Sequence, residues 1–457
     1  MIKKLLKALL YVCLMLACLM TVLVFWMRMG EEEPLDYSPL NFELGPEDPE
    51  INGYTYLREF CQDNHDTIPE NYPIEYSEDY EIQVDYDRYE NWDLEFFKEI
   101  LEANADFMAG VEAAFERPIF MPDREFFPEN IAWHVSYLRS YLILRKIESR
   151  VLHLSGDSEA ALARLADLAD ELSIHAKSGD ALIGLLTNVA MNGILTHELW
   201  VYQANIKISA EQLKRFAKDY DIAEYYADAV KLALKQEFQF MCHATKDTSE
   251  VGAVAYQIPF MDAPSKAELL LQRTLLYVGF RKTRTLNEMF QLYSELVRQF
   301  DRPLSQRNFE YANAVGENGE GKGWGSYINR NPIGGIIRST LTRSMTLVLN
   351  KISMAEVSAS ATRLSMALQA YYMEHESLPD RLDELVPEYL PMIPRDPYDG
   401  QPMRYSKERK IVYSVGDDFV DHGGSEKSFQ FQVDYYDDED AAEHDTAEPT
   451  YPLRFAM

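Results

Sequence analysis

The chain has 457 residues, of which 47% are hydrophobic, enough for a large core and more than one domain. Its 75 acidic and 44 basic residues give a formal net charge of -31. Nucleic acids and anionic lipid surfaces bind basic faces, so we expect neither as a partner of the chain's surface. An acidic surface would attract divalent cations, although acidic side chains also simply keep a protein in solution.

An almost uninterrupted apolar run, Ala8–Met27, is about 20 residues long and could cross a bilayer as one helix. Lys3, Lys4 and Lys7 precede it, and Arg28 follows it. By the positive-inside rule the short N-terminus stays in the cytoplasm and the rest is exported. We therefore predict that residues 1–29 are a cytoplasmic stub and membrane anchor. The protein would be a single-pass protein of the bacterial inner membrane, with the bulk of the chain in the periplasm.

Two other kinds of N-terminal signal compete with this anchor. A cleavable signal peptide is disfavoured because the apolar run exceeds roughly 7–15 residues and lacks a clear small-x-small cleavage site. A lipoprotein signal would use Leu16-Ala17-Cys18, but Met15 is a poor start for it and the run continues past the cysteine. The length of the run favours an uncleaved anchor.

Residues 30–60 are predicted to be an acidic tether. The first part of this range mixes acidic residues with prolines, a composition typical of an extended segment. These prolines are Pro34, Pro39, Pro46 and Pro49.

Two cysteines, Cys61 and Cys242, would lie in the exported part, where disulfides persist. They could pair, but a sequence does not show whether their Cα atoms come within bonding range. Paired and unpaired states both stay open.

Residues 61–335 are predicted to form an α-helical domain, because the dominant period from Trp92 to Gln299 is helical. Two similar breaks, Ser155-Gly156-Asp157 and Ser178-Gly179-Asp180, place a glycine where a helix ends and an aspartate where the next begins. Ser209 and Gln212 have the spacing of a capping box. We expect stacked helical hairpins, with a second helical block over Ser265–Gln299.

This domain carries no recognisable catalytic motif. Gly316–Lys322 has phosphate-loop spacing, but Gly323 stands where a hydroxyl residue is needed and no strand precedes the loop. His197-Glu198 lacks the second histidine of a zinc-protease helix. His134, His153 and His175 have no matched carboxylate or cysteine spacing, so we interpret them as structural.

The most informative segment lies between Ala361 and Gly424. It reads ATRLSMALQAYYMEHESLPDRLDELVPEYLPMIPRDPYDGQPMRY and then IVYSVGDDFVDHGG. A long helix leads into Pro379, then into the Pro394-Arg395-Asp396-Pro397 turn, and later into Ser414-Val415-Gly416-Asp417-Asp418.

This pattern resembles the C-terminal half of the G-type major pseudopilin of bacterial type II secretion systems. The resemblance implies a small α+β module over residues 336–433, in which a long helix from about Ile336 to Glu376 packs on short antiparallel strands. The segment from Ser155 to Leu195 is similar to helical regions of membrane-anchored bacterial proteins that carry the same module, which brings no activity with it.

The chain lacks the Gly-Phe-Thr-Leu-Ile-Glu-like junction of a true pilin, and more than 300 residues separate the anchor from the pilin-like helix. Assembly into a pseudopilus shaft is therefore not expected.

The resemblance also implies a calcium site in the turn after the last predicted strand. Its ligands would be the carbonyl of Val415 and the carboxylate of Asp418, with Asp421 as the nearest second carboxylate. Phe419 replaces the usual glycine, and Asp399 lengthens the preceding turn by one residue. A solvated acidic turn capped by its own backbone is the alternative to calcium.

The expected fold is thus mainly α: an exported helical-hairpin domain, a small pilin-like module, one transmembrane helix, and an acidic tail over residues 434–457. We expect a non-catalytic envelope protein with a structural or docking role, a protein partner in the envelope, and a link to secretion machinery. The alternatives are an envelope hydrolase, with its site in the helical domain, and a calcium-dependent adhesion or sensing module.

Overall fold

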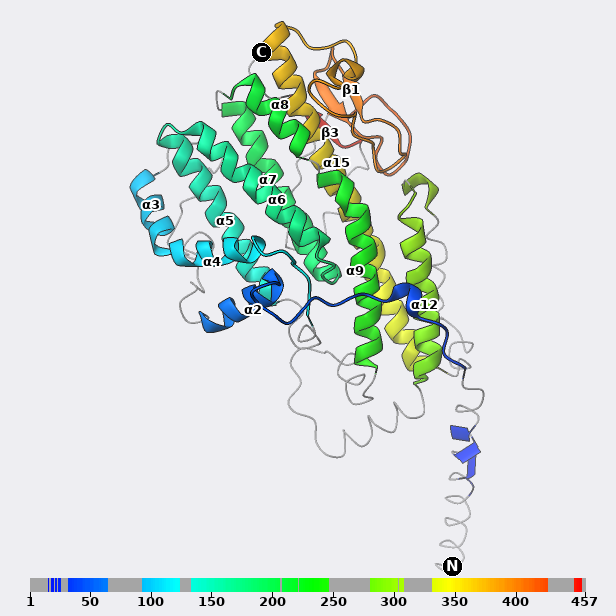
Figure 1. The fold of residues 1–457 in the computed structure, drawn as a ribbon. Coiled ribbons are helices and arrows are strands. Elements are labelled where there is room, and N and C mark those ends of the chain that lie inside the picture. The colour runs from blue at the N-terminus through cyan, green and yellow to red at the C-terminus, as the bar shows by residue number, and fades with distance from the viewer. Residues whose placement is uncertain are drawn as a thin grey trace, which may run out of the picture. The chain divides into compact units, whose positions relative to one another are not determined.

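The computed structural model describes residues 15, 18–19, 21–22, 24–25, 32–64, 93–123, 133–205, 208–220, 222–245, 280–302, 304–307, 331–425 and 448–453. In these ranges the protein is mainly α-helical, with one small antiparallel sheet (Figure 1). The loop Gly316–Lys322, which has phosphate-loop spacing, lies outside them.

The helices and strands are bounded as follows. The α-helices are α2 (Gly53–Asp63), α3 (Leu94–Ala103), α4 (Ala105–Phe115), α5 (Trp133–Leu154), α6 (Ser158–Lys177), α7 (Leu182–Asn205), α8 (Ala210–Asp219), α9 (Ile222–Ala244), α12 (Lys282–Gln299) and α15 (Pro332–His375). Short 3-10 turns are η1 (Ser38–Leu40), η4 (Leu304–Gln306) and η5 (Leu382–Leu385), and the strands are β1 (Arg404–Ser406), β2 (Ile411–Tyr413) and β3 (Thr450–Pro452).

The chain divides into two compact units. The first comprises residues 1–41, 235–298 and 308–347, and the second comprises residues 42–234, 299–307 and 348–457. Both α9 and α15 contribute residues to each unit. The predicted boundary at residue 336 stays a prediction.

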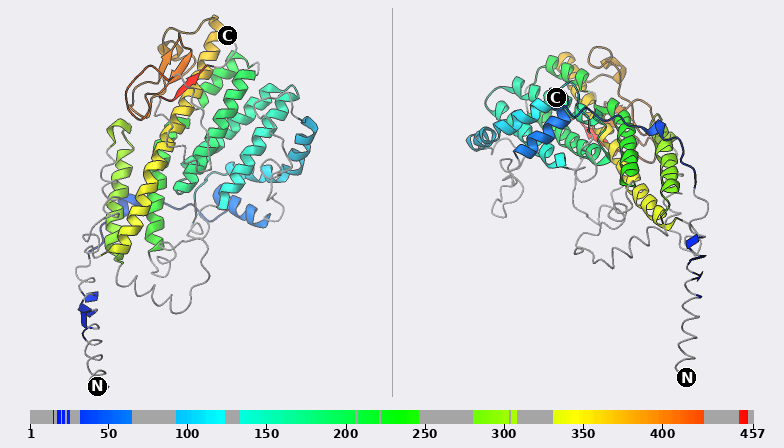
Figure 2. Two further views of the ribbon diagram at one scale, coloured as in Figure 1. Left: turned by 180° about the vertical axis from the view of Figure 1, so that it is seen from behind. Right: turned by 60° about the horizontal axis from the view of Figure 1, so that its bottom comes forward.

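In the second unit, α5, α6 and α7 pack side by side (Figures 1 and 2). The turn between α5 and α6 is built as predicted, whereas in the turn between α6 and α7 the predicted cap, Asp180, lies two residues before the first residue of the helix, Leu182. Gly156 and Gly179 have positive φ angles of 94° and 77°, which glycine adopts without strain. Asp157 caps α6 by accepting a hydrogen bond from the backbone N–H of Ala160. The buried leucines of α6 form one face, at Leu162, Leu165, Leu168 and Leu172.

The segment predicted to be a tether contributes to the core. α2 begins within it, and Tyr54, Leu57 and Cys61 of this helix are each only 1% exposed. Asn52 caps α2 and also pairs with Ile119 in an isolated β-bridge. In the first unit, the Tyr37 hydroxyl donates to Asn287. The prediction missed this burial because acidic residues and prolines dominate the composition of the range.

The predicted membrane anchor, Ala8–Met27, lies largely outside the described residues. The few described positions in it are helical, with Met15, Leu19, Val22 and Phe25 exposed. Within the described ranges no helix combines the length and the apolar character needed to span a bilayer.

The predicted long helix exists as α15, which begins at Pro332 and ends at His375. The second predicted helical block begins in the described residues only at Lys282, as α12. The C-terminal sheet has the order β1-β2-β3 with antiparallel neighbours, so that Val412 pairs with both Tyr405 and Tyr451.

β3 corrects the prediction of an acidic tail over 434–457. Thr450–Pro452 form a strand, and Tyr451 is buried. The apolar residues that follow the acidic run explain the difference, since they cover the open edge of β2.

Candidate functional site

Each residue predicted to bind calcium makes hydrogen bonds to other groups of the C-terminal module. Val415 is buried, and its N–H donates to Asp396 at 2.9 Å. Asp418 is exposed, accepts a hydrogen bond from the N–H of Val420 at 2.9 Å, and lies 2.9 Å from Nε2 of His422. These contacts lower the pKa of Asp418, the Val420 bond more than the His422 bond.

Asp421 completes the predicted set. It is also exposed, and one of its carboxylate oxygens accepts from the Tyr413 hydroxyl and the Gly423 N–H. Both carboxylates are thus capped by their own turn. Calcium stays a prediction, and the group of metal-ligating side chains found among the described residues lies elsewhere.

Asp396 is the polar centre of the C-terminal module. Its buried carboxylate accepts hydrogen bonds from the backbone N–H groups of Tyr398 and Val415 and from the Ser414 hydroxyl, at 2.9–3.0 Å. Arg404 contacts the same carboxylate at 3.0 Å. Burial raises its pKa, although these bonds oppose the shift. One side chain therefore joins the Pro-Arg-Asp-Pro turn to the Ser-Val-Gly turn.

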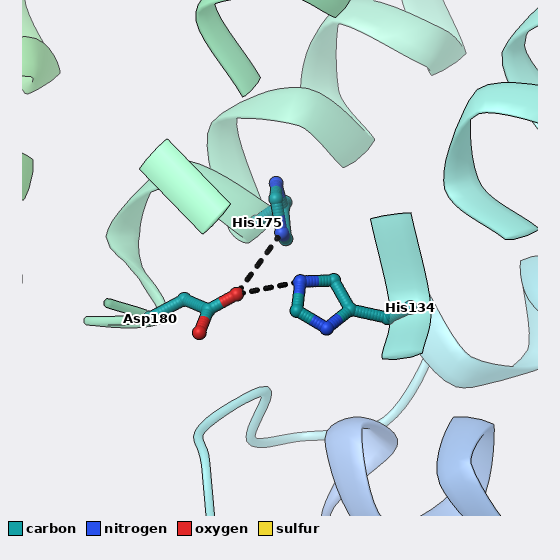
Figure 3. Close-up of side chains that lie close together, drawn as sticks. All are labelled: His134, His175 and Asp180. Carbon is teal, nitrogen blue, oxygen red and sulfur yellow. Dashed lines mark ion pairs between the residues drawn. The ribbon is translucent and has the colours of Figure 1, made fainter. Parts of the chain in front are cut away.

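Three side chains of the second unit converge at one end of α5 and α6: His134, His175 and Asp180 (Figure 3). His134 lies in the first turn of α5, His175 in the last turn of α6, and Asp180 in the turn before α7. Oδ2 of Asp180 is 2.7 Å from Nε2 of His134 and 3.8 Å from Nε2 of His175. No side chain of the three is more than 2% exposed. We call these residues the His-His-Asp cluster.

The turn between α6 and α7 fixes the position of Asp180. Its N–H donates to the Ser178 hydroxyl at 3.1 Å, and its Oδ1 accepts from the Ala181 N–H at 2.8 Å. Oδ2 is left facing the imidazoles. Gly184 provides the space, because a Cβ there would lie 2.0 Å from Oδ2.

Aromatic rings surround the cluster. The ring of Tyr54 lies 5.7 Å from that of His134, and the ring of Phe120 lies 6.3 Å from that of His175. The two imidazoles are themselves 5.7 Å apart. These rings keep the cluster in an apolar environment, where charge interactions are strong.

A chain of buried amides continues from His175. Nδ1 of His175 is 3.3 Å from Nδ2 of Asn188, which donates to the Leu172 carbonyl at 2.7 Å. Oδ1 of Asn188 accepts from Asn192 at 2.8 Å and from the Tyr226 hydroxyl at 3.3 Å. Because Oδ1 is held by two donors, the amide presents its NH₂ to His175. Nδ1 is then the acceptor, and Nε2 carries the proton.

The charge states follow from the surroundings. Burial raises the pKa of Asp180, but the adjacent His134 and His175 lower it more, so the pKa lies well below its usual range. Burial lowers the pKa of His175. At neutral pH the carboxylate is therefore ionised and His175 is neutral.

The cluster has ligands for a transition metal and the groups of a general acid–base pair. Its burial prevents a substrate from reaching it unless the helices open. Sequence reasoning interpreted both histidines as structural and Asp180 as a helix cap. Only the packing of α5 on α6 unites them, since His134 is far from the other two in sequence.

No protein-family model, no curated protein and no solved structure matches this chain. A functional assignment therefore depends on its own residues.

Proposed function

We propose that the protein is a membrane-anchored, non-catalytic component of the bacterial envelope. A helical-hairpin domain in the periplasm would carry a pseudopilin-like module that docks with a protein partner, with secretion machinery as the first candidate. Residues 8–27 would be the anchor.

The observation that carries this proposal is the arrangement around Asp396. The two motifs on which the pseudopilin resemblance depends are joined by the hydrogen bonds of one buried carboxylate. The apolar residues of the same pattern are buried as well, including Leu382, Leu385 and Tyr389. The residues of the pattern thus form the polar centre and part of the core of one compact module, which supports a pseudopilin-like fold.

The pilin-like helix favours docking over polymerisation. Every residue from 361 to 370 of α15 is buried, so this stretch is enclosed on all sides. Trp200 donates to the Thr362 hydroxyl at 2.9 Å, and Arg363 donates to the Ala217 carbonyl at 2.7 Å. Residues 361–370 of α15, enclosed by the helical body, are therefore not available for stacking in a filament.

A crosslinked pull-down of the full-length protein from its native membranes tests the proposal. Met392 and Phe419 are exposed apolar residues of the C-terminal module, at 51% and 42%. We expect wild type to recover envelope proteins that Met392→Glu and Phe419→Glu lose. Ile183→Glu, at an equally exposed position on α7, should retain them.

Recovery of the protein alone, or equal recovery by all variants, would contradict docking through this module. Chelation of calcium and Asp418→Ala form a separate arm. Loss of the partner in both would support calcium in the turn, and unchanged recovery would count against it.

A second candidate, an envelope hydrolase, is favoured by the His-His-Asp cluster. Imidazoles beside a carboxylate are typical of hydrolytic sites. Hydrolysis of chromogenic ester and phosphodiester probes by the full-length protein should then fall at least about 100-fold in His175→Gln. The exposed His197→Gln is the control. Residual activity that is equal in both variants and wild type would exclude this site.

A further inference from the structure

We propose that the His-His-Asp cluster binds a divalent transition metal ion of the zinc class, through Nε2 of His134, Nε2 of His175 and Oδ2 of Asp180. These three atoms lie within 4.8 Å of one another. Two imidazoles and one carboxylate suit zinc, whereas calcium prefers oxygen ligands alone. The metal would bind whether or not the C-terminal module docks with a partner.

The spacing of the atoms fits a tetrahedral ion. Ligands that bind zinc at about 2.0–2.1 Å lie roughly 3.3 Å apart in this geometry. The two distances from Oδ2 to the imidazole nitrogens, 2.7 Å and 3.8 Å, fall on either side of that value. Shifts of about half an ångström would bring both of these distances to that value.

The hydrogen bonding gives independent support. Within the described residues, Nε2 of His175 is buried and has no partner at hydrogen-bond distance, because Oδ2 of Asp180, which it faces, is 3.8 Å away. Both imidazoles face the same Oδ2 (Figure 3), and a buried polar atom without a hydrogen bond is costly. A cation bound by the three atoms would satisfy Nε2 of His175 and neutralise the buried carboxylate.

Asn188 affects which ring nitrogen of His175 can carry the proton when a metal binds. For Nε2 of His175 to coordinate, its proton must move to Nδ1, and the imidazole stays neutral. Nδ1–H then needs an acceptor, but Asn188 presents its NH₂ there. Binding would therefore require the Asn188 side chain to turn. A carboxylate at 188 would accept from Nδ1–H directly, as in carboxylate–histidine–zinc triads.

The test uses the full-length protein in detergent, purified without a histidine tag and stripped with a chelator. We expect wild type to bind one Zn²⁺ per chain by elemental analysis, and Zn²⁺ to raise its Tm. His175→Gln and Asp180→Asn should lose both effects, and His197→Gln should keep them. Asn188→Asp should bind Zn²⁺ about tenfold more tightly.

Several results would overturn the proposal. One is a wild type that takes up no stoichiometric Zn²⁺ and shows no change in Tm. Another is equal uptake by wild type and His175→Gln, which would place the ion on the acidic surface. If the cluster variants do not fold, the visible absorption spectrum of wild type with Co²⁺ is the alternative test. Absence of the band of four-coordinate Co²⁺ would exclude the site. An equal Tm rise with Ca²⁺ would also argue against it.

Discussion

Phe419 lies in the turn after β2 with a φ of 60° and is 42% exposed. This left-handed conformation is costly for a residue with a Cβ, and glycine adopts it freely. We therefore expect Phe419→Gly to be more stable than Phe419→Ala by about 1 kcal/mol in urea unfolding. Both variants lose the ring contact with Tyr398, so the difference in stability between them measures the cost of the backbone conformation alone.

The adjacent Val420 is the control, because it is similarly exposed and its φ is not positive. There the alanine variant should be the more stable of the two, since glycine gains more entropy on unfolding. The same order of stability at both positions would show that Phe419 is not strained.

Gly184 packs so closely against Asp180 that a side chain at this position should be destabilising. A Cβ at this position would meet Oδ2 and Cγ of Asp180 at 2.0 and 2.3 Å. Gly184→Ala should therefore displace Asp180 from His134 and lower the free energy of unfolding by about 1–3 kcal/mol, despite the better helix propensity of alanine. Urea unfolding measures this change.

Gly335 of α15 is the matched control. The described residues place nothing within 4 Å of a Cβ there, so Gly335→Ala should be neutral or stabilising by up to about 1 kcal/mol. A neutral Gly184→Ala would show that the position of Asp180 is not sterically fixed.

At the scale of elements, local signals were predictable from the sequence. The capping box of α8 is confirmed, since the Ser209 hydroxyl accepts from the Gln212 N–H and the Gln212 side chain accepts from the Ser209 N–H. Gly156 and Gly179 end their helices as predicted. Each of these features depends on residues within a few positions of one another, and propensity and periodicity describe such interactions well.

Features that depend on tertiary contacts were missed. α2 was not predicted, because it begins in an acidic, proline-containing range. Only its packing shows that Tyr54 is a core residue. The His-His-Asp cluster unites three segments that have no shared spacing. The role of Asp180 illustrates the limit. Its place in a helix-starting turn was correct, but its contacts with two histidines follow from the packing of α5 on α6.

α15 carries a buried acid, Glu356, whose pKa is raised to about 7 by burial, with Arg307 opposing the shift. The folded state thus binds a proton that the unfolded state, with a pKa near 4.5, has released. The free energy of unfolding should fall as pH rises through this window, by up to about 3 kcal/mol from this group. Urea unfolding between pH 4.5 and pH 7 measures the slope.

Glu356→Gln should flatten this slope, and Glu384→Gln is the control. Hydrogen bonds from the Arg381 backbone lower the pKa of the exposed Glu384, so it titrates below the window. An unchanged slope in Glu356→Gln would mean that Glu356 is ionised in the folded protein.

At the scale of the whole molecule, the net charge of -31 should make the stability of the protein depend on salt concentration. Like charges repel more in the compact state than in the unfolded chain. Raising the ionic strength from about 0.01 M to about 0.15 M shortens the screening length from about 30 Å to about 8 Å. The free energy of unfolding in urea should therefore increase with NaCl. A decrease would mean that attractive ion pairs outweigh the net repulsion.

The strand order β1-β2-β3 also determines when the sheet can close during synthesis. β1 and β2 follow one another closely, but β3 begins at Thr450, far beyond the end of β2 at Tyr413. Until the ribosome has made and released that stretch, β2 has an open edge, with main-chain groups that any passing strand could pair with. A nascent chain halted before Thr450 would be a substrate for chaperones, whereas one extended past Pro452 can shield its own edge.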